Sequence, residues 1–155
     1  MNMTVSQGKP VVFMDRDNTL IADPGYLGDA SAVTLIDGAA DAVRRLRAAN
    51  YEIVVVSNQS GVARGLMTEE DVQSVNRRMR ELLAEQGADT DAIYYCPYLD
   101  GPEAVRETYR RDSDLRKPKP GMLMLAARDR GLDLGRSWMI GDSSRDMLAG
   151  KAAGC

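Results

Sequence analysis

Short apolar runs recur along this chain, and each is followed by polar residues at its carboxyl end. The runs are Val11–Met14, Ile53–Val56, Ala92–Tyr95 and Ser137–Ile140. The first is bounded by turn signals and has the length typical of a strand buried on both faces of a sheet. Segments with helical periodicity separate the runs. The pattern therefore predicts an α/β fold with a doubly wound parallel sheet.

Four helices are expected between and after these strands. A Thr-Glu-Glu-Asp sequence at 68–71 resembles a capping box and marks the start of the longest helix, and Gly131 marks the end of another. Asp37 is expected to cap the first helix. A long polar loop, from Cys96 to about Pro118, has a length that is usually functional or disordered. The expected helices span residues 38–50, 68–87, 120–130 and 144–153.

Composition narrows the class of protein. The chain has 155 residues, of which 44% are hydrophobic and 28% charged, and this is typical of one globular domain. A net charge of −3 without a basic run argues against a nucleic-acid partner. No segment has the apolar length of a signal peptide core or of a membrane span, so we expect a cytoplasmic protein without a membrane partner. Two cysteines are too few for a disulfide framework.

Polar side chains gather where the strands end. Asp15 and Asp17 follow the first strand, Ser57 follows the second, and Asp142 follows the fourth. Ligands bind at the carboxyl ends of strands in such sheets, so these groups are expected to converge. Converging carboxylates would repel one another without a cation, and oxygen donors with no histidine suit Mg²⁺. Lys117 lies in a basic group that closes the third crossover.

Mg²⁺, a lysine and a hydroxyl can together neutralise the oxygens of a phosphoryl group. A carboxylate can then attack phosphorus and form an aspartyl-phosphate intermediate. Two other classes use similar groups. A receiver-type signalling domain carries its acceptor aspartate after the third strand, where this chain has Tyr95-Cys96-Pro97. A phosphosugar-binding domain without catalysis would not need Asp17. Steady phosphate release separates an enzyme from both.

The separated motifs Asp15–Thr19, Ser57, Lys117 and Gly141–Asp142 with Asp146 resemble, in this order, the haloacid dehalogenase superfamily of aspartate-nucleophile phosphotransferases. The resemblance implies a Rossmann-type three-layer sandwich and a Mg²⁺-dependent phosphatase acting on a small phosphorylated sugar. Within the superfamily, three segments are similar to heptose bisphosphate phosphatases, with histidinol-phosphate phosphatases as close relatives. These segments are Ser57–Gly65, Ile93–Pro97 and Arg116–Leu123.

The resemblance also implies roles for individual residues. Asp15 would be the nucleophile and a metal ligand, and Asp17 the general acid and then base, with its main-chain carbonyl as a second ligand. Ser57 and Lys117 would hold the phosphoryl oxygens, and Asp142 would complete the protein's share of the Mg²⁺ shell. Besides Ser57 and Lys117, the expected substrate contacts are Asp23, Gly25, Tyr26, Asn58, Gln59, Ser60, Arg64 and Arg116. Asp146 is expected to act indirectly, from behind the metal ligands.

The chain departs from the family pattern at several positions. Asn18 stands where the family usually has glycine, and Asn tolerates a left-handed conformation better than other side chains. Ser143 replaces a lysine that is frequent in the heptose enzymes. The insertions after the first and third strands are only loops, so no large cap domain is expected. We expect residues 1–155 to form one domain without the last strand and helix of the family.

Many relatives clamp the loop after the third strand with a structural zinc ion. The corresponding residues here are Cys96, Tyr98, Ser113 and Leu115, which leaves one plausible ligand of four. A structural zinc site needs about four Cys or His ligands. We therefore expect Mg²⁺ as the cofactor and no structural zinc. The sequence leaves the oligomeric state open.

Overall fold

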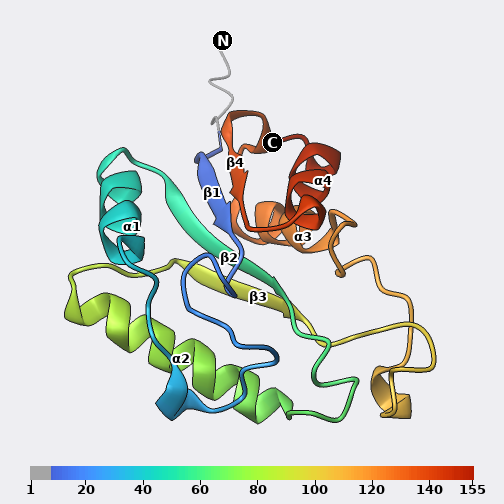
Figure 1. The fold of residues 1–155 in the computed structure, drawn as a ribbon. Helices are drawn as coiled ribbons and strands as arrows, with labels where there is room; N and C mark the ends of the chain where they lie inside the picture. The colour runs from blue at the N-terminus through green and yellow to red at the C-terminus, as the bar shows by residue number, and fades with distance from the viewer. Residues whose placement is uncertain (1–7) are drawn as a thin grey trace.

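A computed structural model of the protein describes residues 8–155 and contains a four-stranded parallel sheet in the order β3-β2-β1-β4 (Figure 1). The bounds of each strand lie within two residues of the predicted ones at either end. In the centre of the sheet Val12 pairs with Ile53 on one side and with Trp138 on the other. The predicted doubly wound parallel sheet is confirmed. The strands are β1 (Val11–Met14), β2 (Glu52–Asn58), β3 (Ala92–Cys96) and β4 (Trp138–Ile140).

Helices cover both faces of the sheet and make three layers (Figure 1). On one face α1 (Ala39–Ala48) and α2 (Glu69–Glu85) pack in a core that contains Val12 and Met14 of β1. On the other face α3 (Gly121–Arg130) and α4 (Ser144–Ala153) pack in a core with Val11 and Phe13. The four residues of β1 are all buried. The expectation that this strand is covered on both faces is therefore confirmed.

The helix ends follow the sequence signals with one exception. The capping box of α2 forms between Thr68 and Asp71, and Gly131 ends α3 in the left-handed conformation with φ 64°. The prediction that Asp37 caps α1 is wrong. Gly38 occupies that position with φ 82°, a conformation suited to glycine, and no side chain caps the helix. Among residues 8–155, no helix is both long enough and apolar enough to cross a membrane.

Three short 3₁₀ helices lie in the connections, namely η1 (Ala30–Ala32), η2 (Glu107–Tyr109) and η3 (Leu134–Arg136). The long loop after β3 contains η2 and is attached to α2 through Glu69. The hydroxyls of Tyr95 and Tyr109 donate to the two oxygens of this carboxylate at 2.8 and 2.9 Å. The Arg111 guanidinium lies 3.7 Å from the centre of the Tyr98 ring. These contacts hold the loop in place through side chains of the protein. The expectation that the loop binds no structural zinc stays a prediction.

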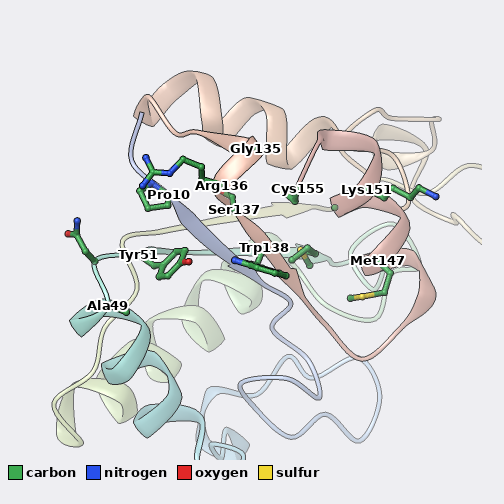
Figure 2. A pocket seen from close by; sticks show the side chains of 13 residues that line it. Pro10, Ala49, Tyr51, Gly135, Arg136, Ser137, Trp138, Met147, Lys151 and Cys155 are labelled. Atoms are coloured by element: carbon green, nitrogen blue, oxygen red, sulfur yellow. The ribbon is translucent and has the colours of Figure 1, made fainter. Parts of the chain in front are cut away.

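The outer edge of the sheet at β4 is open. Trp138 is 64% exposed and Ile140 is 41% exposed, because β4 is the last strand of the sheet and no element among residues 8–155 covers these side chains at its edge. A hollow of about 740 Å³ lies beside the strand, between the end of α1 and the side of α4 (Figure 2). Its lining includes Tyr51, Trp138 and Met147, and it shares no residue with the polar pocket described next.

Candidate active site

Three carboxylates meet at the carboxyl ends of β1 and β4. Asp15, Asp142 and Asp146 each offer an oxygen within 4.8 Å of the others. They border a polar pocket of about 190 Å³, so the predicted convergence of strand ends is seen in the structure. The residues around this pocket are Asp15, Asp17, Asn18, Asp23, Asn58, Lys117, Asp142, Ser143, Arg145 and Asp146.

The backbone fixes two of these carboxylates. The N–H of Asp15 donates to the carbonyl of Ile140 at 2.9 Å, which ties the end of β1 to the end of β4. Asp146 lies in the first turn of α4, where its Oδ2 accepts from both the N–H and the hydroxyl of Ser143 at 3.1 Å. A side chain at Gly141 would collide with this carboxylate, since a Cβ there would lie 2.2 Å from Oδ2. Glycine at position 141 therefore leaves the space that the Asp146 carboxylate occupies.

Lys117 is the cation of the cluster and is only 2% exposed. Its Nζ donates to Asp15 Oδ1 at 2.9 Å, to Asp146 Oδ1 at 2.6 Å and to the carbonyl of Val56 at 2.8 Å. Asn58 holds the main chain of Lys117, because its amide donates to the Lys117 carbonyl and its oxygen accepts from the Lys117 N–H. Asn58, predicted to contact substrate, therefore also positions this lysine.

The electrostatics of the cluster favour a further cation. Burial, above all, raises the pKa of Asp15 to about 6, and Asp146 adds to the rise while Lys117 opposes it. The three carboxyl groups share one ammonium group, which pairs with Asp15 and Asp146, and this leaves an excess of negative charge in the cluster when all are ionised. Three oxygen donors around a small polar pocket fit a hard divalent ion such as Mg²⁺. The residues that would hold it through carboxylates are Asp15, Asp142 and Asp146.

Asp146 lies within reach of the same ion, but both of its oxygens already accept hydrogen bonds, from Lys117 and from Ser143, and its indirect role stays a prediction. The carboxyl of Asp17 does not join the acidic cluster. Its Oδ1 accepts from Arg16 Nε at 2.7 Å, and its Oδ2 accepts from Gln59 Nε2 at 2.9 Å. The metal role given to its main-chain carbonyl stays a prediction. Gln59 Nε2 also donates to the buried hydroxyl of Ser57 at 2.7 Å, so the amide of Gln59 links two predicted catalytic groups.

The loop after β1 forms one wall of the pocket. Asn18 has φ 58°, so it does adopt the left-handed conformation at the position where the family usually has glycine. Its Oδ1 accepts from the N–H of Asp23 at 3.0 Å. Asp23 lines the pocket and its carboxylate accepts from the N–H groups of Gly25 and Leu27. Of the predicted substrate contacts in this loop, Asp23 borders the pocket, whereas Gly25 and Tyr26 do not.

Three arginines, Arg64, Arg116 and Arg145, lie close enough to influence one another, but Arg64 and Arg116 do not line the pocket. Arg145 lines the pocket, and the Arg64 guanidinium lies 5.6 Å from the centre of the Tyr26 ring. Burial, followed by the charges of Arg145 and Arg64, lowers the pKa of Arg116. Among residues 8–155, Nε of Arg64 and Nη1 of Arg116 are buried and have no hydrogen-bond partner. Ser60 is buried and does not border the pocket, and its carbonyl accepts from the Arg64 N–H at 3.0 Å.

Comparisons with known proteins agree with this geometry. A family model described as a haloacid dehalogenase-like hydrolase matches residues 15–154. D-glycero-β-D-manno-heptose-1,7-bisphosphate 7-phosphatase from Photorhabdus laumondii is 43% identical over 96% of this chain and 78% of its own length. A HAD-like phosphatase from Mesorhizobium loti has a TM-score of 0.89 and 39% identity, over 95% of this chain and 69% of that one.

A third similar protein was crystallised with ligands. The structure of D,D-heptose 1,7-bisphosphate phosphatase from B. bronchiseptica was solved in complex with magnesium and phosphate. It has a TM-score of 0.79 and 33% identity to this chain, and the match covers 94% of this chain and 77% of that one.

Proposed function

Since this chain belongs to the haloacid dehalogenase-like hydrolases, we propose that it removes the 7-phosphate of D-glycero-β-D-manno-heptose 1,7-bisphosphate with Mg²⁺ as cofactor. The observation that carries the proposal is the buried cluster of Asp15, Lys117 and Asp146 at the strand ends. It combines a carboxylate beside the pocket, which can act as a nucleophile, with a fixed ammonium group, which can stabilise negative charge during phosphoryl transfer.

The chemistry assigned to the residues runs in two steps. An oxygen of Asp15 forms a bond to phosphorus while the bond from phosphorus to the sugar oxygen breaks, and Asp17 gives that oxygen a proton. Water then attacks the phosphorus of the aspartyl-phosphate, Asp17 takes the proton of the water, and phosphate leaves. Lys117 and Ser57 bind the phosphoryl oxygens throughout. Mg²⁺, when bound, supplies positive charge beside those oxygens.

The group of three arginines supports a substrate with a second anionic group. Guanidinium groups bind phosphate oxygens through paired N–H donors, and Arg64 and Arg116 each have a buried nitrogen without a partner. A bisphosphate brings a second phosphate to these arginines, whereas histidinol phosphate has only one. Arg145 lies close to the position where heptose enzymes often have the lysine that Ser143 replaces, so it offers a cation at the same side of the pocket.

Phosphate release from a panel of metabolites tests the function. The panel contains the heptose 1,7-bisphosphate, the heptose 7-phosphate, histidinol phosphate and other sugar phosphates. We expect the bisphosphate to have the highest kcat/KM and release to continue over many turnovers. A single phosphorylation event without turnover would favour the receiver-type alternative, and a higher kcat/KM for histidinol phosphate would refute the proposed substrate.

Replacing Arg145 is expected to change the choice of substrate. Arg145→Gln removes one charge-assisted hydrogen bond to the second phosphate, worth roughly 1.5–3 kcal/mol, or about 10- to 100-fold in kcat/KM for the bisphosphate. The heptose 7-phosphate lacks that group, so its kcat/KM is expected to change less than about threefold. The matched control is Arg128→Gln, on an exposed helix surface. Equal losses on both sugars would contradict the role of Arg145.

Removal of the metal is expected to abolish the phosphatase activity. Treatment with EDTA should abolish phosphate release and added Mg²⁺ should restore it, because the excess of negative charge in the cluster repels a phosphate group. Asp142→Ala removes one of the three carboxylates and should raise the Mg²⁺ concentration needed for half of the maximal rate. Titration of activity with Mg²⁺ measures both effects. Full activity of wild-type protein in excess chelator would show that the carboxylates do not serve a metal.

A further inference from the structure

Arg16 is the largest fully buried side chain among the described residues, and the two steps above do not use it. Its exposed fraction is 0%. A charged group taken out of water is costly unless ionic and hydrogen-bonding partners replace the lost hydration. Arg16 stands between Asp15 and Asp17 in the sequence, so its partners lie next to the reacting groups.

The partners of Arg16 come from the catalytic loop and from α2. Nε donates to Asp17 Oδ1 at 2.7 Å and Nη2 donates to Asp17 Oδ2 at 3.3 Å. Nη1 donates to Oδ1 of the buried Asn76 at 2.9 Å. The guanidinium therefore contacts both oxygens of one carboxyl group and is anchored on its other side by a helix.

A paired contact between neighbouring residues needs a particular backbone. Along an extended chain successive side chains point to opposite sides, so Arg16 and Asp17 would face away from each other. The chain turns here instead. The carbonyl of Arg16 accepts from the N–H groups of Leu20 and Ile21, and Asn18 adopts its left-handed conformation. The turn brings the side chain of Asp17 back onto the buried guanidinium.

We infer that Arg16 is a positioning residue for Asp17, with Asn76 as its anchor. Its paired N–H donors hold the Asp17 carboxyl in one orientation, from which the carboxyl gives a proton to the departing oxygen and later takes one from water. Gln59 holds the same carboxyl from a second direction, at Oδ2. The inference rests on the proposed function, because it requires Asp17 to be the acid and base of a phosphatase.

A purely structural role would give a different kinetic signature. In the first step an alkyl phosphate needs a proton on its departing oxygen, whereas p-nitrophenolate leaves without one. Misplacing the acid should therefore slow phosphorylation of Asp15 by an alkyl phosphate and leave phosphorylation by p-nitrophenyl phosphate nearly unchanged. General damage to the fold or to phosphate binding would slow both. The formation of phosphorylated enzyme, measured by rapid quench with Mg²⁺ present, isolates this step.

Three variants separate these possibilities. Arg16→Gln removes the charge and the paired contact, Arg16→Lys keeps the charge but loses the paired geometry, and Asn76→Ala removes only the anchor. A displacement of about 1 Å at a reacting group can cost about a hundredfold. We expect Arg16→Gln to slow phosphorylation by the alkyl phosphate about 10- to 100-fold, with smaller losses in the other two variants. With p-nitrophenyl phosphate each variant should stay within about threefold of wild type.

Asp17→Asn and Arg130→Gln complete the experiment. Arg130→Gln breaks a partly buried ion pair with Glu52 away from the pocket, and both substrates should then react at wild-type rates.

Asp17→Asn should show the strongest dependence on the leaving group. If it shows none, the proposed acid is wrong and the proposed function fails with it. If Asp17→Asn shows the dependence but the Arg16 and Asn76 variants slow both substrates equally, the positioning role alone is overturned. Should Arg16→Gln not fold, Arg16→Lys and Asn76→Ala decide.

Discussion

Asp15→Asn is expected to abolish turnover, with a fall in kcat of about 10⁴-fold or more. The neutral amide is a poor nucleophile toward phosphorus and a weaker ligand for Mg²⁺. It also loses the charge that Lys117 contacts at 2.9 Å. Phosphate release from the heptose bisphosphate measures the loss, and rapid quench should detect no phosphorylated enzyme.

The folded state of this variant provides the control. Without metal, the pKa of Asp15 lies near 6, above its ordinary value of 3.8, because burial disfavours the ionised carboxyl. The stability linked to this group is therefore present below about pH 3.8 and is lost as the pH rises through about 6. At pH 7 in chelator, Asp15→Asn should be at least as stable as wild type in urea unfolding. Substantial turnover by this well-folded variant would refute the covalent mechanism.

The sequence alone predicted the architecture well because the strand signals were local and strong. Val11–Met14 and Ile53–Val56 are apolar runs that end in turn-forming or polar residues, and parallel topology then places those residues at one edge. This geometric rule brought Asp15 and Asp142 to one pocket before any side-chain contact was known, whereas the role of Lys117 followed only from the family resemblance. Thr68 and Gly131 marked helix ends through interactions made within a few residues, so they too could be read locally.

The residues that were missed depend on long-range packing. Arg16 was passed over because a charged residue is normally taken to face water, and only the tertiary structure supplies the buried partner Asn76, 60 positions away. The contact between Asp146 and Lys117 spans 29 positions, so the sequence could not show which cation this carboxylate pairs with. The β4 edge shows the same limit. Trp138 and Ile140 have strand-forming side chains, yet their exposure depends on what lies beyond the edge of the sheet.

Lys117→Met is expected to impair both stability and turnover. Methionine fills the space but cannot donate hydrogen bonds and carries no charge. Asp15, Asp146 and the Val56 carbonyl therefore lose the donor that they share. Removing one member of a buried ionic cluster typically costs about 3–5 kcal/mol of unfolding free energy. Loss of a fixed donor to the phosphoryl oxygens should lower kcat by a further 10²- to 10³-fold, as a rough range.

Lys119→Met is the matched control for this prediction, because Lys119 lies two residues away and pairs with Asp112 and Asp114 at the surface. Exposed ion pairs contribute about 0–1 kcal/mol, so this control should unfold close to wild type and turn over normally.

Mg²⁺ should raise the melting temperature of Lys117→Met more than that of wild type. The reason is that a bound cation would then meet two carboxylates that have lost their ammonium partner, and ligands that bind the folded state stabilise it. If Lys117→Met matched Lys119→Met in both stability and rate, the ammonium group would not hold the cluster together. The two carboxylates would then have to be stabilised by some other contact.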